Sequence, residues 1–423
     1  MPQLPGVCIP HLSFRQTLRR RVMKVTREEA LRLILSHVKP VGKEVKTLHE
    51  CYGRVLGEDL FSPEELPNAD LSAVDGFAVV SSSCRELPAE LKVVETVEAG
   101  KEPVAPIGPG EAAFVMTGGI VPEGADAVVR VEDTLQKGSS VVIEKAVKPG
   151  QLINYRGSEA KKGEKILSEG ELLTPRKVAL IAHVGIYTVK VFRRPKVALI
   201  TTGNEILEPY HSSKPGAARN TNYYLLKGLL ESEGVETVYM GTVEDSPEKL
   251  KTVIEEAAEN ADLVVTTGGI SKGKFDFVKR AVPELGFKVF FNSTNIRPGR
   301  PLLFAVKEGK TLIGLPGYPA ATTVNALEFL LPAVRKLAGR SDVENRYIKA
   351  TAAEKLHSRE GRVDFVRVTI HQENGKITVK NAGSQQTANY TSMALCDGLA
   401  VVEAHRGEVK AGEQVEVLPL SWP

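Results

Sequence analysis

The feature that most constrains the fold is a short apolar run that ends in small residues, within residues 261–276. The run at 263–265 is typical of a buried parallel strand, and Thr266-Thr267-Gly268-Gly269 follows it directly. Glycines allow a sharp turn and leave backbone N–H groups open to a ligand. Ser271 keeps the loop small, and Asp276 can cap a helix that follows. An ordinary strand-to-helix turn is the alternative interpretation.

Two further apolar runs end in the same way. Residues 196–200 lead into Thr201-Thr202-Gly203-Asn204-Glu205. Residues 311–315 lead into Pro316-Gly317-Tyr318-Pro319. Each of these three segments therefore has the pattern of a buried strand followed by a loop of small and polar residues.

Helical patterns lie between these runs. Residues 222–233 carry leucines on one face and stop at Gly234, and Ser246-Pro247 provides an N-cap and a first helical residue for a second helix. Alternating strands and helices predict a doubly wound parallel sheet, which binds ligands outside the carboxyl ends of its strands. The three loops should therefore share one crevice. None of the three loops is a common nucleotide-binding loop, because the chain has no G-x-x-x-x-G-K-[ST] and no G-x-G-x-x-G that opens a helix.

Composition limits the class of protein. A length of 423 residues predicts three or four domains, and 42% hydrophobic with 25% charged residues are globular values. A net charge of +3 gives no support to a nucleic-acid role. No apolar run approaches the roughly 18 residues of a membrane helix.

The N-terminal residues and the cysteines bear on location. Residues 1–22 lack the apolar core of a secretory signal, so we expect a disordered arm or an overlong gene model before Met23. A capping box at 26–29 then opens a helix. Four scattered cysteines without C-x-x-C, and dispersed histidines, predict a reducing cytoplasm and neither a zinc site nor a disulfide framework.

The remaining segments predict a multidomain α/β and β protein. We expect a discontinuous domain, a β-rich insertion, an αβ domain and a C-terminal β-barrel. The insertion has candidate strands at 77–80, 91–96, 127–131 and 141–143. The expected domain ranges are 23–62 with 150–190, 63–149, 191–338 and 339–423.

Eight motifs, ordered along the chain, carry a resemblance to a known family. They are SAVDGFAV (72–79), MTGGIVPEGADAVVRVED (116–133), RGSE (156–159), TTGNEI (201–206), NTN (220–222), TTGGISKGKFD (266–276), RPGRP (297–301) and LPGYP (315–319). From about residue 23 to the C-terminus the chain closely resembles the molybdopterin molybdenumtransferase family, to which the E-domain of gephyrin belongs.

The resemblance implies an architecture and a reaction. It implies an αβ domain with the fold of the molybdopterin adenylyltransferases, and a homodimer whose active site lies between that domain of one subunit and the elongated part of the other. Family members take adenylylated molybdopterin and molybdate or tungstate, insert the metal into the dithiolene and release AMP. They use a divalent cation, usually Mg²⁺. The implied partners are these small molecules and the molybdopterin adenylyltransferase, without nucleic acid or membrane.

The residue chemistry agrees with such a substrate. A pterin with phosphates needs backbone N–H donors, which Thr202-Gly203 and residues 268–271 can supply. Glu205 and Asp276 can accept hydrogen bonds from pterin N–H groups, although Asp276 can equally be a helix cap. Magnesium needs one or two carboxylates beside phosphate oxygens, and Asp75 is preferred over a plain turn.

Family matching extends the candidate site. The expected catalytic residues are Asp75, Glu159 and Glu205, and the expected metal ligands are Asp75 and Asp126, each of which can instead be a structural turn or cap. The expected substrate-binding residues are Thr117, Thr202, Gly203, Asn204, Asn220, Asn222, Gly268, Gly269, Ser271, Asp276, Arg297, Gly299, Arg300, Pro316 and Gly317.

The segment Arg297-Pro298-Gly299-Arg300-Pro301 is expected to bind an oxyanion. Its prolines and glycine restrict the backbone, so both arginines can be held close together. Like charges held close need an anion, and arginine offers paired donors to a tetrahedral oxyanion. A solvated loop with two surface arginines is the alternative.

The chain departs from the family pattern at four places. Many members have aspartate at the positions of Asn204 and Asn220, although gephyrin-like members share Asn204. Many have asparagine at the position of Tyr318, and lysines where this chain has Arg297 and Arg300. The asparagines leave open a non-catalytic molybdopterin carrier or scaffold. A hydrolase of another pterin or nucleotide is a third hypothesis, against which SAVDG, GADAVV and the barrel argue.

Overall fold

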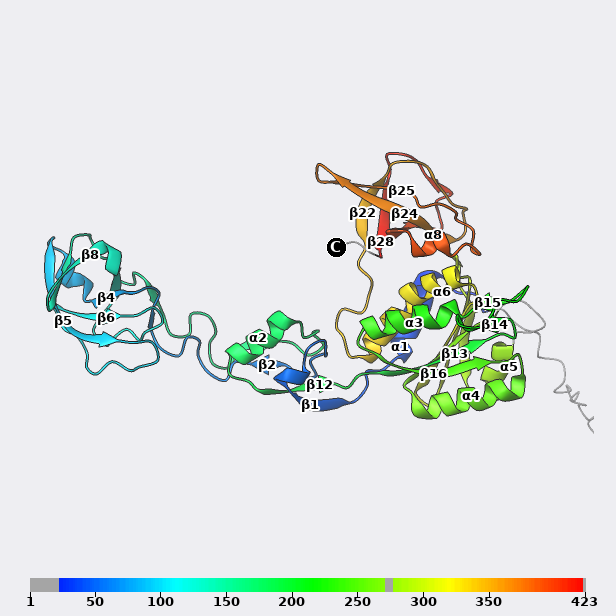
Figure 1. Ribbon diagram of the computed structural model, residues 1–423, viewed down its shortest axis with the longest axis horizontal. Helices are drawn as coiled ribbons and strands as arrows, with labels where there is room; N and C mark the ends of the chain where they lie inside the picture. Colours follow the sequence, from blue (N-terminus) through cyan, green and yellow to red (C-terminus); the bar gives the residue numbers. More distant parts are fainter. Residues whose placement is uncertain (1–22, 271–276, 421–423) are drawn as a thin grey trace, which may run out of the picture. The chain divides into compact units, whose positions relative to one another are not determined.

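The computed structural model describes residues 23–270 and 277–420, and the chain falls into two compact units (Figure 1). One unit joins Met1–Glu44 to Phe192–Pro423, and the other is Val45–Val191. The second unit is therefore inserted into the sequence of the first, after its N-terminal helix. Among the described helices, none is long and apolar enough to cross a membrane.

The first unit is built on a sheet whose six described strands have the order β16-β13-β17-β21-β20-β18. They are β13 (Lys196–Thr202), β16 (Glu236–Val243), β17 (Leu263–Thr267), β18 (Lys288–Ser293), β20 (Pro301–Lys307) and β21 (Lys310–Leu315). The first four in spatial order are parallel, and β20 and β18 are antiparallel to their neighbours. Because β13 lies between β16 and β17, the strand order reverses beside it, which is where such sheets bind ligands.

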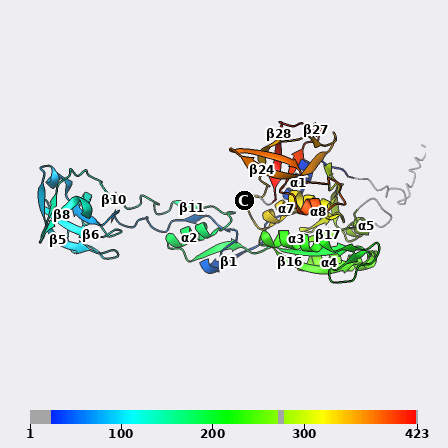
Figure 2. The ribbon, with the colours of Figure 1, turned by 45° about the horizontal axis from the view of Figure 1, so that its top comes forward.

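Helices cover both faces of this sheet, as the two views in Figures 1 and 2 show. On one face lie α4 (Pro247–Asn260) and α5 (Phe277–Glu284), whose Leu250, Ile254 and Val278 pack with Ala198 and Val264 of the strands. The other face carries α3 (Thr221–Ser232), α6 (Pro319–Asn325) and α7 (Leu331–Leu337), with α1 (Arg27–His37) against α7. A π-helical segment, Ala326–Leu330, joins α6 to α7. The expected doubly wound αβ fold is confirmed.

The helix starts follow the sequence signals. Thr26 accepts a hydrogen bond from the Glu29 N–H at the start of α1, and Ser246 does the same for Lys249 at the start of α4. Helix α3 begins one residue before the predicted 222, because the Asn220 side chain caps it by accepting from the Tyr223 N–H. The predicted cap Asp276 lies outside the described residues.

The C-terminal part of the first unit is the expected β-barrel. Five of its described strands close into the ring β24-β25-β22-β28-β26, with β26 pairing back to β24. These strands are β22 (Ile348–Ala352), β24 (Val363–Glu373), β25 (Lys376–Asn381), β26 (Gly398–Val402) and β28 (Gln414–Pro419). Alternate residues such as Val366, Val368 and Ile370 point into one apolar core. The short strands β23 (Leu356–His357) and β27 (Glu408–Val409) pair beside the ring.

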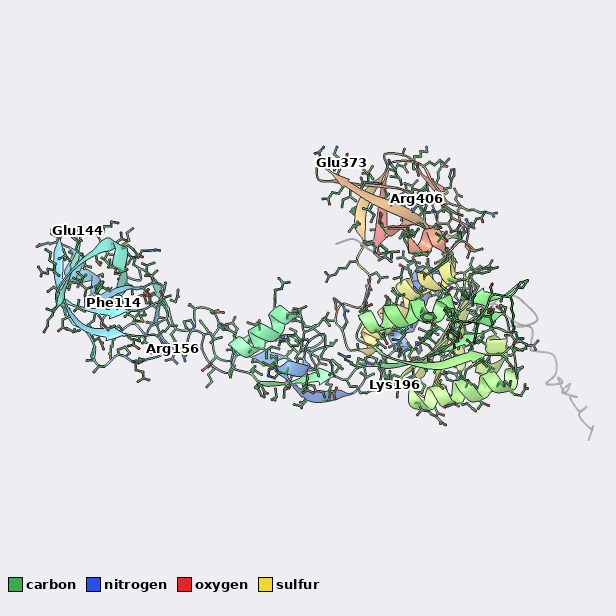
Figure 3. The ribbon with its side chains drawn as sticks, in the orientation of Figure 1. Phe114, Glu144, Arg156, Lys196, Glu373 and Arg406 are labelled. Carbon is green, nitrogen blue, oxygen red and sulfur yellow. The ribbon has the colours of Figure 1, made fainter. Side chains whose placement is uncertain are left out.

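The inserted unit contains a second sheet, with the described order β7-β4-β6-β5-β9-β8. Its strands are β4 (Gly76–Val79), β5 (Ala89–Val97), β6 (Glu111–Val115), β7 (Ala127–Arg130), β8 (Thr134–Lys137) and β9 (Ser140–Ile143). Phe114, labelled in Figure 3, meets Phe77 across β6 and β4 with ring centroids 5.3 Å apart. The four strands predicted for this region are present, with boundaries shifted by one or two residues.

The rest of the inserted unit is a smaller α/β cluster. Helix α2 (Pro175–His183) has Pro175 as its first residue and is followed by Gly185 in a left-handed conformation. Short strand pairs accompany it: β2 (Leu60–Phe61) with β11 (Lys165–Leu167), β3 (Leu71–Ser72) with β10 (Ile153–Asn154), and β1 (Lys43–Thr47) with β12 (Thr188–Phe192). Leu56, Leu173 and Ile181 form the centre of its apolar core.

Candidate active site

A cavity of about 1140 Å³ opens at the carboxyl ends of the parallel strands of the first unit. Lys196, labelled in Figure 3, begins β13, and Thr202 ends that strand at the cavity. The described lining residues all belong to the first unit. They come from segments 201–206, 218–222, 267–270, 294–301, 316–319 and 359–362, together with Lys24, Asp245 and Thr387. The three predicted loops therefore do share one crevice.

The glycines of these loops have two different roles. The Gly203 N–H donates to the Val243 carbonyl (3.2 Å) and the Gly268 N–H to the Leu315 carbonyl (3.0 Å), so both hold the edge of the sheet. Among described residues the N–H groups of Gly269 and Ile270 have no partner. Gly268 must be glycine, since its φ is +89° and a Cβ would lie 2.6 Å from Thr202 Oγ1.

Asn222 reaches the cavity from α3. Its Nδ2 donates to the Gly317 carbonyl (2.9 Å), which ties α3 to the loop after β21. Its Oδ1 is buried and accepts no hydrogen bond within the described part of the chain. A buried acceptor without a donor is costly, so Asn222 Oδ1 is suited to an N–H or O–H of a ligand.

The asparagines that depart from the family pattern have specific partners. Asn220 is buried, and its Nδ2 donates to Glu208 Oε1 (2.7 Å) and to the Tyr239 hydroxyl (2.7 Å). An aspartate there could not donate, and its charge would face Glu208. Asn204 Oδ1 accepts from the Asp245 N–H (3.1 Å).

Two carboxylates line the cavity near the ends of β13 and β16. Glu205 folds back over Gly203, where a Cβ would meet its carboxylate oxygens at 2.8 and 2.9 Å. Burial raises the pKa of Asp245, and the charge of Glu205 raises it further. No group of three His, Cys, Asp or Glu side chains that could hold a metal ion occurs in the described ranges.

The two arginines of the 297–301 loop both line the cavity. Thr294 N donates to the Arg300 carbonyl (2.8 Å) and Asn325 Nδ2 to the Pro301 carbonyl (2.9 Å), so the loop is fixed by its backbone. Gly299 has φ +112°, and a Cβ on it would lie 2.5 Å from Asn325 Oδ1. Neither Arg297 nor Arg300 forms an ion pair within the described residues, and both side chains are exposed. Their guanidinium groups are therefore available to an anion.

The barrel also contributes to the cavity, which the sequence did not predict. Strand β19 (Ile296–Arg297) pairs with β24, with Arg297 opposite Asp364. This pairing brings the turn at 359–362 and Thr387 to the cavity wall. Residues 359–362 have the composition of a solvated turn, so only knowledge of the β19–β24 pairing could have singled them out. The sequence analysis also missed Asp245 and Lys24, because neither residue lies in a recognisable motif.

In the inserted unit, Asp75 is held by one partner. Asp75 Oδ1 accepts from the Thr117 N–H (2.6 Å) and from Thr117 Oγ1 (2.8 Å). The backbone bond and then the hydroxyl bond keep the pKa of Asp75 below its usual value. The carboxylate is exposed and ionised, with Oδ2 free of hydrogen bonds to the described residues. Thr117 thus positions Asp75.

The other two acidic candidates of this unit have different surroundings. Asp126 accepts from the Ser81 N–H (2.6 Å) and from Ser81 Oγ (2.7 Å), one donor for each carboxylate oxygen. Glu159 Oε1 lies 3.0 Å from His183 Nε2 at an exposed position. These contacts give Asp126 a local structural role, whereas Glu159 remains accessible.

Three family models together cover most of the chain. The region described as "MoeA N-terminal region (domain I and II)" matches residues 25–185. A "Probable molybdopterin binding domain" matches 198–336, which contains most of the cavity-lining residues. The "MoeA C-terminal region (domain IV)" matches 349–420, the barrel.

Relatives of similar length match nearly end to end. A molybdopterin molybdenumtransferase from Nostoc sp. is 33% identical over 89% of this chain and 88% of its own, and one from Haemophilus influenzae is 33% identical over 90% and 95%. A crystal structure of a molybdopterin biosynthesis MoeA protein from Pyrococcus horikoshii is 33% identical, with a TM-score of 0.79 over 93% of this chain and 98% of that one. The chain therefore belongs to the molybdopterin molybdenumtransferase family, as its eight motifs predicted.

Proposed function

We propose that this transferase binds adenylylated molybdopterin in the cavity of its first unit, inserts molybdenum from molybdate into the dithiolene, and releases AMP. Tungstate has the same shape and charge and is an alternative substrate. The observation that carries the proposal is the pair Arg297 and Arg300, which lines the cavity without a carboxylate partner in the described chain.

The arginine loop suits a tetrahedral oxyanion. Arginine presents several N–H donors in a plane and binds such oxygens with paired hydrogen bonds. Arg359, from the barrel, lines the same cavity and likewise has no ion pair within the described residues. Molybdate and the phosphates of the substrate are the anions that could use this positive charge.

The strand-end loops suit the pterin and its phosphates. The free N–H groups of Gly269 and Ile270 can donate to phosphate oxygens at the switch point of the sheet. Asn222 Oδ1 and the carboxylate of Glu205 can accept from pterin N–H groups. The predicted contacts of Ser271 and Asp276 concern residues outside the described ranges.

The cavity carboxylates fit a magnesium ion. Mg²⁺ is typically bound by one or two carboxylates together with substrate phosphates and water. Glu205 and Asp245 provide two carboxylates, and burial together with the charge of Glu205 raises the pKa of Asp245, a cost that a cation would offset. Mg²⁺ held there would neutralise phosphate charge during release of AMP.

We propose that Asp75 and Glu159 act in a homodimer, and that Asp126 supports the local structure through Ser81. They belong to the inserted unit, whereas the cavity belongs to the first, and the family arrangement combines the corresponding parts of two subunits. Asp75 is favoured as the catalytic and metal-binding carboxylate, because one oxygen is fixed by Thr117 and the other is free. Light scattering should give twice the chain mass at micromolar concentration, and a monomer mass would exclude the arrangement.

The cytoplasm is the proposed location. Cys51, Cys84 and Cys396 are free and buried, which is typical of proteins in a reducing compartment. The molybdopterin adenylyltransferase, as the source of the adenylylated substrate, is the proposed protein partner.

A carrier or scaffold that binds molybdopterin without turnover is the second candidate. The amide group of Asn220 is used by Glu208 and Tyr239, so this position supplies no carboxylate to a metal. Glu205 and Asp245 remain in the cavity, however, and this favours the enzyme.

Release of AMP from adenylylated molybdopterin separates the two functions. The enzyme should release AMP in a molybdate-dependent manner, should stop when Mg²⁺ is removed by a chelator, and should yield product that contains molybdenum. Binding of the substrate without release of AMP, at any molybdate concentration, would instead identify a carrier.

A further inference from the structure

Arg367 of the barrel is an unusual arginine, because it is buried and has no counter-ion. Its side chain is 1% exposed. It forms no ion pair with a described carboxylate, and its Nε has no hydrogen-bond partner there. A buried charge without an opposite charge is costly, and such a residue needs a compensating role.

The hydrogen bonds of Arg367 all go to one loop. Its Nη1 donates to the Ser384 carbonyl (2.5 Å), the Gln386 carbonyl (3.1 Å) and Ser392 Oγ (2.9 Å). Its backbone is bound by the Gln385 side chain, which accepts from the Arg367 N–H (3.0 Å) and donates to its carbonyl (2.9 Å). One residue of β24 therefore fixes the segment 384–392 from two sides.

This loop lies between the barrel and the cavity. Thr387, at its centre, lines the cavity together with Arg297 and Arg300. Tyr390 of the same loop lies near Thr323 of α6, the helix that follows the cavity segment 316–319. No described strand pairs within this segment, so it is held by its own hydrogen bonds, such as that from the Ser392 N–H to Asn389 Oδ1, together with those from Arg367.

Arg367 also interacts electrostatically with Arg297 of the 297–301 loop. Burial lowers the pKa of Arg367 most, and the positive charge of Arg297 acts in the same direction. The two cations thus repel each other, and solvent around the exposed Arg297 side chain weakens this repulsion. An anion beside Arg297 would relieve this repulsion.

We propose that Arg367 is a positioning residue for oxyanion binding, which acts by holding the 384–392 loop against the cavity. It does not touch the substrate. This role rests on the proposed molybdenum transfer, and it assigns to the barrel a part in the affinity for molybdate.

The test measures AMP release as a function of molybdate at saturating adenylylated molybdopterin. Arg367→Met removes the charge and all three side-chain hydrogen bonds at nearly constant volume. It should raise the molybdate concentration for half-maximal rate by about tenfold, the lower end of the effect of a charge-assisted contact. The KM for adenylylated molybdopterin should change less than twofold. Arg367→Lys keeps the charge and should recover part of the loss.

A matched control is Arg335→Met in α7. Arg335 is also largely buried, but Glu233 pairs with it and it does not line the cavity. This variant should lower the melting temperature without changing molybdate half-saturation.

The proposal would be overturned if Arg367→Met lowered only the melting temperature, as is expected of Arg335→Met. If Arg367→Met does not fold, a half-saturation of Arg367→Lys within twofold of the wild type would overturn it as well. Failure of the wild-type protein to release AMP would contradict the proposed function instead, so the two outcomes are distinguishable.

Discussion

The charged residues of the two units differ in how the protein satisfies them. In the inserted unit the family-matched carboxylates have protein partners: Thr117 for Asp75, Ser81 for Asp126 and His183 for Glu159. In the first unit, Arg297, Arg300 and Glu205 line a cavity without an ion pair in the described residues. The role of a motif residue can therefore be assigned only when its partners in the structure are known.

The difference has an energetic basis. Hydrogen bonds from Thr117 stabilise the ionised form of Asp75, and those from Ser81 fix the orientation of Asp126. Arg297 and Arg300 line the cavity without an ion pair in the described residues, so their positive charge is complementary to an anion. The acidic side chains of the inserted unit are thus fixed by protein partners, and Asp75 differs in that its Oδ2 accepts no hydrogen bond from the described residues.

Asp75→Asn should give the largest effect. The asparagine Oδ1 can still accept from Thr117, so the local structure is retained while the charge is lost. We expect AMP release to fall on the order of a hundredfold, the lower end for a group that acts in the transition state. Asp59→Asn is the matched control, because Asp59 also accepts a backbone N–H, from Glu169, and pairs with Lys165. Unchanged release by Asp75→Asn at limiting Mg²⁺ would return Asp75 to a structural turn.

Arg300→Ala comes next. Loss of a charge-assisted contact of about 1.5–3 kcal/mol should weaken the molybdate dependence of turnover by about ten- to a hundredfold. Binding of the pterin should be nearly unchanged. Arg300→Lys should restore most of the affinity if charge alone matters, and little if paired donors matter. Arg346→Ala, at an exposed arginine, is the control. A molybdate titration of Arg300→Ala that overlays the wild type would show that the loop is only structural.

The sequence predicted the fold of the first unit well, for physical reasons. Apolar runs such as 263–265 and the caps Ser246 and Thr26 are local signals, and local signals fix strands and helix starts. The loops after β13, β17 and β21 meet because the carboxyl ends of parallel strands lie at one edge. These features needed no knowledge of long-range contacts.

The site was predicted less completely. Arg359, Thr387 and Arg367 reach or support the cavity through the pairing of β19 with β24, which joins residues 67 positions apart in register. Sequence gives no local signal for such a pairing. The predicted N–H donor of Gly203 is used within the sheet instead, since the Val243 carbonyl lies opposite it. The roles assigned to Asp75, Asp126 and Glu159 stay predictions.

Asp126→Asn tests whether the carboxylate of Asp126 stabilises the fold of the inserted unit or binds a metal ion. Asparagine Oδ1 can still accept from the Ser81 N–H, and its Nδ2 can donate to Ser81 Oγ, so both contacts become neutral hydrogen bonds and lose the contribution of the charge. We expect a loss of about 1 kcal/mol in the free energy of unfolding, measured by denaturant titration, with unchanged AMP release. A shift in Mg²⁺ dependence at unchanged stability would contradict the comparison and support Asp126 as a metal ligand.

Asp245→Asn should have the smallest effect on stability. It tests whether Asp245 serves Mg²⁺ binding in the cavity at a cost to the stability of the fold. Burial, and then the charge of Glu205, raise the pKa of Asp245. The folded protein therefore disfavours the charged form, which lowers stability above the folded pKa and ceases to do so as the pH falls below the unfolded pKa. Asp245→Asn should thus raise the melting temperature at pH 7 on the order of one degree. This gain should disappear at acidic pH, while Mg²⁺-dependent AMP release falls.

Asp262→Asn provides the contrast within the same unit. Burial favours a higher pKa for Asp262, but hydrogen bonds from Arg193 and the Lys196 N–H outweigh it and hold the pKa below its usual value. Its charge is therefore stabilising above the unfolded pKa, and this contribution is lost as the pH falls through the folded pKa. Asp262→Asn should lower the melting temperature at pH 7, and the difference from the wild type should shrink in acid. If both variants shifted the melting temperature in the same direction at pH 7, the distinction between a carboxylate left for a ligand and one satisfied by the protein would fail.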